Sequence, residues 1–267
     1  MRHPIAAGVG GAGGWRALTW AAEFAAHTGE RLILLHVCVP GSPLDRTVND
    51  PTPAEVEVVD PALARAYTTV RDRLGHERTV LKIRAGSPSE QLADASAGAR
   101  LLVIGDGEGG RTVRRVVRQA HCPIVVVRPP ARVPASPYAG HVVAGVDDSP
   151  ASRAALEMAY AYAEQNRLPV AALHVSGQAP GDAAGLLADA VAPWTRAYPL
   201  VPTRCSVLAG PVGDQLVHAA AGARLLVVGD KRRGVIGRAR TGDVPLTVAT
   251  EAPCPVAVVP LAQRDAW

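Results

Sequence analysis

The sequence predicts an α/β fold with two domains, each a five-stranded parallel sheet covered by helices. One observation is an internal repeat, because the string Ala-Gly-Ala-Arg-Leu-Leu-Val occurs at residues 97–103 and again at 221–227, each time running into a Gly-Asp pair. The other is a series of short, continuously apolar runs in each half. Apolar runs without polar alternation are typical of strands that are buried on both faces of a parallel sheet.

Further anchors follow in the same order in both halves, so the chain is a tandem repeat. Ala-Gly-Val stands at 7–9 and 144–146, Leu-His-Val at 35–37 and 173–175, and Cys-Pro at 122–123 and 254–255. A chain of 267 residues divided in this way gives two units that can each bury a core. The proline-rich segment 129–137 predicts an extended linker. We therefore expect one domain over residues 1–130 and a second over 139–267.

The second repeat shows the elements best. Residues 142–146 predict a strand, and Ser149 followed by Pro150 supplies an N-cap and a first-turn proline for a helix. Leu156, Ala159 and Ala163 continue that helix at helical spacing, before Pro169. Apolar runs predict further strands at 170–175, 205–208, 225–228 and 256–259. The first repeat has the same order, with a helix from about Arg111 and a last strand at 124–127.

Composition and charge exclude several classes of protein. Apolar residues make up 48% and charged residues 19%, and no stretch of about eighteen residues lacks a charge or turn signal, which argues against a membrane protein. The glycine-rich N-terminal run lacks the apolar core of a secretion signal, so we expect a cytoplasmic chain. A net charge of +4 with 4% aromatic residues is too weak a signal for a nucleic-acid partner.

The cysteines predict neither a metal site nor disulfide chemistry. Cys38, Cys122, Cys205 and Cys254 show no C-x-x-C spacing and no histidines at zinc-ligand intervals, so we expect free thiols. Cys122 and Cys254 precede the last strand of each repeat and are expected to be small buried hydrophobes.

Several motifs together resemble the universal stress protein family in tandem form. They are the Gly-Val-Asp-x-Ser-Pro at 145–150, Leu-His-Val at the end of the second strand, Gly-Ala-Arg-Leu-Leu-Val-Val-Gly at 222–229, and Pro-Cys-Pro-Val at 253–256. The resemblance covers nearly all of both halves. It implies Rossmann-like domains of the adenine nucleotide alpha hydrolase type and a non-catalytic stress regulator. In one branch of the family it implies ATP with Mg²⁺, held by a loop of form G-x-x-G-(nine residues)-G-[ST].

The second repeat matches that loop in length but only partly in chemistry. Gly229 and Gly242 match, whereas Arg232 replaces the second glycine and Asp243 the final Ser or Thr. Such glycines let the backbone curl around phosphates at the start of a helix. The candidate nucleotide-binding residues are Val146, Asp147, Gly229, Gly242 and Val244.

The chemistry at Asp243 and Asp147 leaves ATP binding open. A carboxylate at Asp243 about 4 Å from a phosphate would oppose it by about 4 kcal/mol at an effective dielectric near 20. Arg232, Lys231 and the nearby arginines could offset this by pairing with phosphate or with Asp243 itself. Alternatively, Asp243 simply caps a helix and the arginines are solvated. Asp147 either accepts hydrogen bonds from the nucleoside, as the resemblance implies, or only shapes a turn.

The first repeat is a poorer match on both loops. Gly10 replaces the equivalent of Asp147, and the later loop is 8 residues shorter, with no Gly-[ST] element. We expect this repeat not to bind ATP in the family manner but to act as a structural or regulatory partner. Glycines at 8–13 and 105–110 fit G-x-G-x-x-G, the pattern of a dinucleotide-binding oxidoreductase. The next strand lacks the acidic residue that should meet a ribose, so a tight turn of small residues is the better explanation.

No catalytic residue is assigned. His36 and His174 end matching strands without a nearby nucleophile or carboxylate motif, so we expect no enzyme. Arg111, Arg114, Arg115 and Arg118 share one helical face, which is either solvated or a dock for an anion or partner.

Two function classes remain from the sequence, and one expectation concerns assembly. The protein is either a nucleotide-responsive regulator or a nucleotide-free scaffold that acts on protein partners. The resemblance also implies that the strands at 124–127 and 256–259 pair with each other as an intramolecular pseudo-dimer, or with a second chain in a homodimer.

Overall fold

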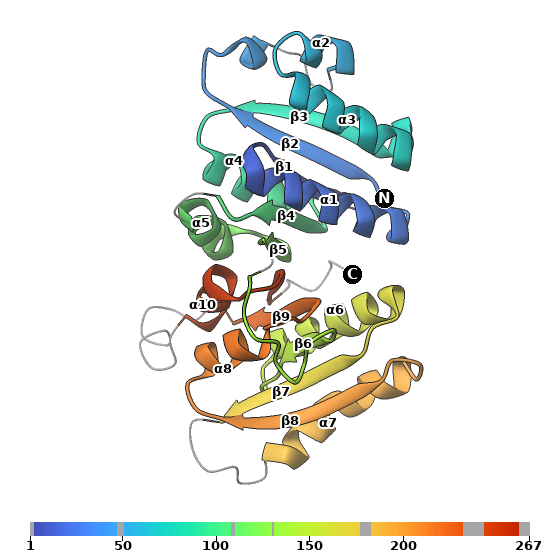
Figure 1. Ribbon diagram of the computed structural model, residues 1–267, viewed down its shortest axis with the longest axis vertical. Helices are drawn as coiled ribbons and strands as arrows, with labels where there is room; N and C mark the ends of the chain where they lie inside the picture. The colour runs from blue at the N-terminus through green and yellow to red at the C-terminus, as the bar shows by residue number, and fades with distance from the viewer. Residues whose placement is uncertain are drawn as a thin grey trace. The chain divides into compact units, whose positions relative to one another are not determined.

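The computed structural model describes residues 3–46, 51–107, 110–129, 131–176, 183–231 and 243–261. The chain divides into two compact units, Met1–Arg128 and Pro129–Trp267 (Figure 1). None of the described helices is long and apolar enough to cross a membrane.

The first unit is a parallel sheet in the order β3-β2-β1-β4-β5. Its strands are β1 Ile5–Val9, β2 Leu32–Cys38, β3 Thr79–Ala85, β4 Leu101–Gly105 and β5 Ile124–Val127. Its helices are α1 Gly11–Thr28, α2 Pro53–Glu57, α3 Pro61–Leu74, α4 Pro88–Ala95 and α5 Arg111–Gln119, with short 3₁₀ turns η1 Pro43–Arg46, η2 His76–Arg78 and η3 Ser96–Gly98. Helix α1 packs against α3, and α4 packs against α5.

The second unit repeats this plan in the order β10-β9-β6-β7-β8. Its strands are β6 Val142–Gly145, β7 Val170–Ser176, β8 Thr203–Ala209, β9 Leu225–Asp230 and β10 Val256–Pro260. The described helices are α6 Pro150–Asn166, α7 Ala183–Ala197, α8 Val212–Ala219 and α10 Val244–Glu251. The predicted fold class is confirmed, since each unit is an α/β domain on a five-stranded parallel sheet flanked by helices.

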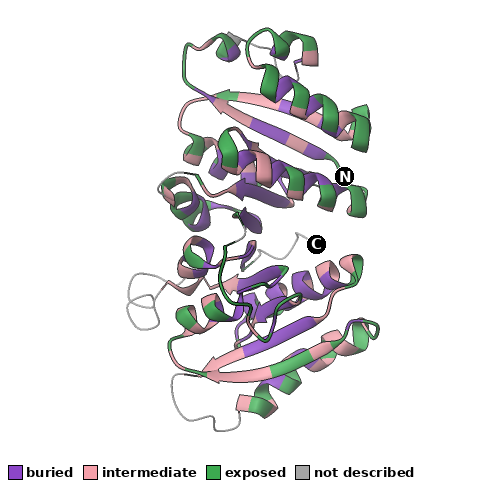
Figure 2. Ribbon diagram, viewed as in Figure 1, coloured by how far each residue is buried: buried purple, intermediate pink, exposed green. Residues whose placement is uncertain are grey.

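Continuous apolarity predicts the strands correctly because the central ones are buried along their length. Every residue of β5 and of β10 is buried, and so are the first four residues of β4 and β9 (Figure 2). Edge strand β8 is more exposed, with Arg204, Cys205 and Ala209 open to solvent. Burial on both faces excludes polar side chains, which is why alternation is missing from the central strands.

Helix α6 begins as its sequence predicts. The Ser149 hydroxyl accepts the Ser152 backbone N–H at 3.2 Å, and Pro150 occupies the first turn. Leu156, Ala159 and Ala163 are buried against the sheet. The helix ends at Asn166, three residues before Pro169, where Arg167 adopts a left-handed conformation with φ of 54°.

The cysteines are free, as predicted. Cys38, Cys122 and Cys254 are buried, whereas Cys205 is exposed on β8. Burial raises the pKa of the Cys254 thiol to about 12.

The end of the linker packs on the second unit. The Ser136 hydroxyl donates to the carbonyl oxygen of Ala219 at 2.7 Å, and the Gly140 N–H donates to that of Gly222 at 2.9 Å. Residues 131–136 carry no helix or strand, in agreement with the extended spacer that the prolines predict. The pairing expected of strands 124–127 and 256–259 stays a prediction.

Candidate functional site

A cavity of about 250 Å³ opens at the carboxyl ends of β6, β7 and β9 in the second unit. Its walls come from residues 145–147, 173–175, 228–231 and 243–245, together with Ser152, Val212 and Leu216. β6 lies between β9 and β7, so the strand order reverses at β6, and open α/β sheets hold ligands at such a point. The cavity is near the lower end of the sizes that small-molecule sites occupy, roughly 300–1,000 Å³.

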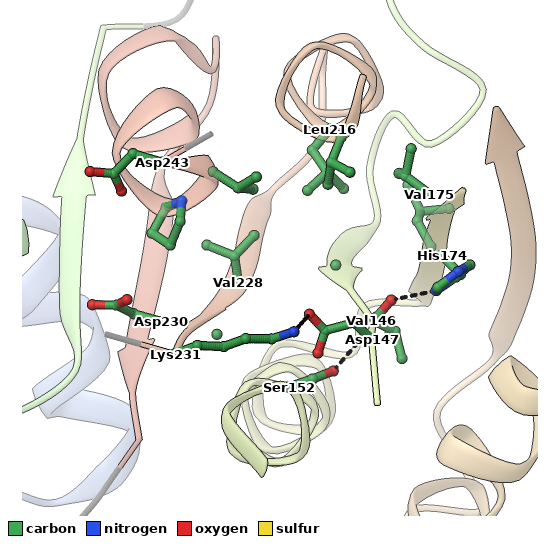
Figure 3. Close-up of a pocket in the computed structure, with 16 residues that line it drawn as sticks. Val146, Asp147, Ser152, His174, Val175, Leu216, Val228, Asp230, Lys231 and Asp243 are labelled. Carbon is green, nitrogen blue, oxygen red and sulfur yellow. Dashed lines mark hydrogen bonds and ion pairs between the residues drawn. The ribbon is translucent and has the colours of Figure 1, made fainter. Parts of the chain in front are cut away.

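Asp147 is held in this cavity by three contacts, and Figure 3 draws those to Ser152 and Lys231. Its Oδ1 accepts the Ser149 backbone N–H at 2.9 Å, and its own N–H donates to the Ser152 hydroxyl at 3.0 Å. Its Oδ2 lies 2.7 Å from the ammonium of Lys231, the residue that follows β9. Asp147 therefore shapes the turn before α6, while its role toward a nucleoside stays a prediction.

Opposing effects act on the Asp147 carboxyl. Burial by itself would raise its pKa, but the hydrogen bonds from Lys231 and Ser149 and the positive charge of Lys231 outweigh burial, so the pKa lies below its usual value. The carboxylate is therefore ionised at neutral pH and presents a negative charge at one wall of the cavity.

His174 holds the backbone next to Asp147. Its Nδ1 lies 2.9 Å from the carbonyl oxygen of Val146, and because a carbonyl can only accept, that ring nitrogen carries the proton. The ring thus ties the end of β7 to the loop after β6. In the second unit this contact gives the histidine of the Leu-His-Val motif a structural position.

Gly229 lies where strand β9 meets the start of α6. A Cβ atom at this position would stand 2.5 Å from the carbonyl carbon of Ala151, closer than real contacts allow. In the first unit a side chain at Gly105 would likewise collide with the backbone of Gly13 on α1. The glycine of the Gly-Asp pair in each repeat therefore allows close helix–strand packing, and in the second unit Gly229 and Asp230 also line the cavity.

The wall opposite Asp147 is partly apolar and partly acidic. Leu216 and Val228 form its apolar part, and Asp230, Asp243 and Val244 also line the cavity. Asp243 occupies the N-cap position of α10, but its side chain makes no capping hydrogen bond, so the interpretation of Asp243 as a side-chain cap is wrong. Its φ of −96° and ψ of 69° depart from the extended backbone of a typical N-cap.

Four of the five candidate nucleotide-binding residues come together. Val146, Asp147, Gly229 and Val244 all line the one cavity. Gly242 and Arg232 lie outside the described residues, as do the arginines at 233, 238 and 240.

The first unit carries a different cavity, of about 710 Å³, at the matching strand ends. Glycines at positions 8, 10, 11, 13 and 14 line much of it, with His36, Arg16 and Asp106. The Asp106 carboxylate pairs with Arg16 at 3.3 Å and with Arg128 at 3.6 Å. Gly10 takes the place of Asp147 with φ of 129°, a conformation that favours glycine, so this cavity has no carboxylate at that point. The expectation that this unit does not bind ATP in the family manner stays a prediction.

Sequence reasoning missed how the cavity is built. Lys231 was expected to help neutralise phosphate or Asp243, yet its ion pair is with Asp147. The sequence also did not predict the contact of Ser152 with Asp147, because a serine on the apolar face of a helix is usually a small residue that packs in the core. The spacing of Ser152, three residues after the N-cap Ser149, is the sequence pattern that could have pointed to it, and the folded protein leaves Ser152 only 2% exposed.

Comparison with known proteins agrees with this architecture. The model of the universal stress protein family matches residues 1–128 and 139–260. A universal stress protein of Mycolicibacterium smegmatis is 31% identical in an alignment of 278 positions, and the alignment covers 91% of this chain and 92% of that protein. One from Mycobacterium tuberculosis H37Rv is 32% identical over 188 residues, covering 62% of this chain and 63% of that protein, less than two thirds of its length.

A solved structure extends the likeness to the fold. The crystal structure of a universal stress protein from Archaeoglobus fulgidus superposes with a TM-score of 0.73 at 14% identity, covering 98% of each chain. At that identity the match supports the architecture alone. With both repeats matched by the family model, the chain belongs to the universal stress protein family, as a tandem of two family domains.

Proposed function

We propose that this protein is a non-catalytic regulator of the stress response that acts in the cytoplasm and binds an adenine nucleotide, ATP with Mg²⁺, in its second unit. The observation that carries the proposal is the meeting of Val146, Asp147, Gly229 and Val244 at one cavity. Val146 and Asp147 follow strand β6, Gly229 lies near the end of β9 and Val244 begins helix α10, so only the folded sheet brings these residues together.

The cavity has an end suited to each part of a nucleotide. The ionised carboxylate of Asp147 can accept hydrogen bonds from nucleoside hydroxyls, while Leu216 and Val228 offer apolar contact to a base. Phosphates would meet the first turn of α10 at Val244, where unpaired N–H groups and the helix dipole favour an anion. Pro245 removes one of those N–H donors, so this end is weaker than an ordinary helix start.

A nucleotide-free scaffold is the second candidate, and the acidic lining favours it. The carboxylate of Asp243 stands at the start of α10, where a phosphate would lie, and like charges repel. In this alternative the second unit keeps the family fold and acts through protein partners.

Calorimetric titration of ATP-Mg into the full chain separates these candidates. We expect saturable binding that Asp147→Ala weakens by about tenfold or more, since a lost charged hydrogen bond costs about 1.5–3 kcal/mol. The matched control is Asp148→Ala, because Asp148 is adjacent, exposed and outside the cavity lining. Absence of wild-type binding favours the scaffold, and restoration of binding by Asp243→Ser would assign the loss to that carboxylate.

A further inference from the structure

One ion pair stands in the way of a ligand that approaches Asp147. The Lys231 ammonium lies 2.7 Å from Oδ2, and the Lys231 side chain runs along the cavity wall from the end of β9 to the end of β6 (Figure 3). The Lys231 side chain is 25% exposed and that of Asp147 is 42% exposed, so solvent reaches both partners. The contact is therefore partly screened and can be exchanged.

The two partners differ in freedom to move. Asp147 is anchored by the Ser149 N–H on its other oxygen and by its own N–H to the buried hydroxyl of Ser152. The ammonium of Lys231, by contrast, ends a flexible four-carbon stem that reorients easily. When a ligand competes for Oδ2, Lys231 is the partner that must give way.

The cost of displacing Lys231 depends on the charge of the ligand. A neutral nucleoside replaces the ion pair at Asp147 with a hydrogen bond from a neutral hydroxyl, and it leaves the ammonium without its Asp147 partner. A phosphorylated nucleoside supplies a new anion within the same cavity, which Lys231 and the start of α10 at Val244 both line. The ammonium can then change partner rather than lose one.

We infer that Lys231 is the specificity-determining residue of the second-unit site, and that its exchange between Asp147 and a ligand phosphate selects phosphorylated over unphosphorylated adenosine. This inference rests on the proposed function. It assigns to Lys231 a role in choosing the ligand class, in addition to any contribution to overall affinity.

AMP and adenosine are the matched probes, because they share the nucleoside and differ only in the phosphate. Their dissociation constants are measured by calorimetry on the full-length protein and on Lys231→Met, which keeps chain length and removes the charge. We expect the wild type to prefer AMP and Lys231→Met to reduce the adenosine-to-AMP ratio of dissociation constants by about tenfold, by weakening AMP and strengthening adenosine. Lys231→Arg should keep the preference.

The control for net charge is Arg153→Met, because Arg153 is exposed on α6 and does not line the cavity. It should leave the ratio unchanged. A Lys231→Met variant that binds both probes with the wild-type ratio would overturn the inference and leave the proposed function standing. If neither the wild type nor Lys231→Met binds either probe, the inference fails, and the proposed function fails with it only if ATP-Mg does not bind either.

Discussion

The backbone of Gly229 at the end of β9 approaches Ala151 in α6 so closely that a Cβ atom at position 229 would lie 2.5 Å from the Ala151 carbonyl carbon. The same approach recurs between Gly105 and Gly13 in the first unit. The glycine at the end of the repeated string therefore holds the first helix of each unit against the fourth strand. In the second unit the same glycine also lines the cavity.

Substituting Gly229 by alanine should destabilise the protein by about 1–3 kcal/mol, because backbone lies where the new methyl group would go. Urea unfolding followed by circular dichroism measures the loss. Gly98→Ala is the matched control, since a Cβ at position 98 meets nothing within 4 Å, and should stay within about 0.5 kcal/mol of wild type. Equal effects of the two variants would contradict the packing role.

Ser152→Ala removes the buried hydroxyl that accepts the Asp147 N–H. Leaving that N–H without its acceptor should cost about 1–3 kcal/mol of unfolding free energy. The same variant should weaken ATP-Mg binding in the titration, because Asp147 loses one of its anchors. A variant that unfolds and binds like the wild type would show that Ser152 does not position Asp147.

Arg100 pairs with Glu30, whose side chain is only 4% exposed, whereas Arg224 is the exposed counterpart in the second copy of the repeated string. Arg100→Met leaves a buried carboxylate without this cation and should destabilise the protein by about 3 kcal/mol, the low end for broken buried pairs because Arg100 itself is 28% exposed. Arg224→Met should cost less than about 0.5 kcal/mol. Thermal and urea unfolding of the two variants measure these changes. Similar losses of stability in both would contradict the stabilising role of the Arg100–Glu30 pair.

Burial lowers the pKa of His36, although the Val9 carbonyl and the charge of Asp60 act in the opposite direction. The unfolded chain therefore binds a proton more readily than the folded one, and stability should fall as pH drops through the unfolded value of about 6.5. His36→Asn should lose less unfolding free energy between pH 7.5 and 5.5 than wild type. The exposed His121→Asn serves as control, and an unchanged pH slope in His36→Asn would refute the effect.

Native-state labelling with a thiol reagent such as DTNB should modify Cys205 first, because it is exposed while the other three cysteines are buried. Burial raises the pKa of Cys205 as well, so its rate should increase with pH well above neutrality. Cys254, with a pKa of about 12, should react only after unfolding. Fast labelling that survives Cys205→Ser would contradict this order.

Local patterns predicted much of the fold. Ser149 and Pro150 start α6 as their chemistry requires, and apolar runs identify the strands of the second unit to within two residues at each end. Such features depend on neighbours in the chain, so they can be read from spacing. The residues of the candidate site were found by resemblance to a family, not from spacing alone.

The partners of those residues could not be predicted. Lys231 and Asp147 belong to segments far apart in the sequence, and the parallel register that aligns Val142 with Leu225 and Ala144 with Val227 sets their strands side by side. Asp243 makes no side-chain capping bond at the start of α10, where its backbone is not in the extended conformation of a typical N-cap. The residue type alone does not predict those backbone angles.

The sequence by itself determined the tandem repeat, the parallel α/β class and the family, because repetition, continuous apolarity and capping residues are properties of the chain. Only the tertiary structure decided which charges meet: that Lys231 holds Asp147, that Ser152 anchors the same residue, and that Gly229 lies against Ala151. The physical reason is that side-chain pairing depends on distances of a few ångströms between strand ends, and these distances exist only once the sheet is assembled.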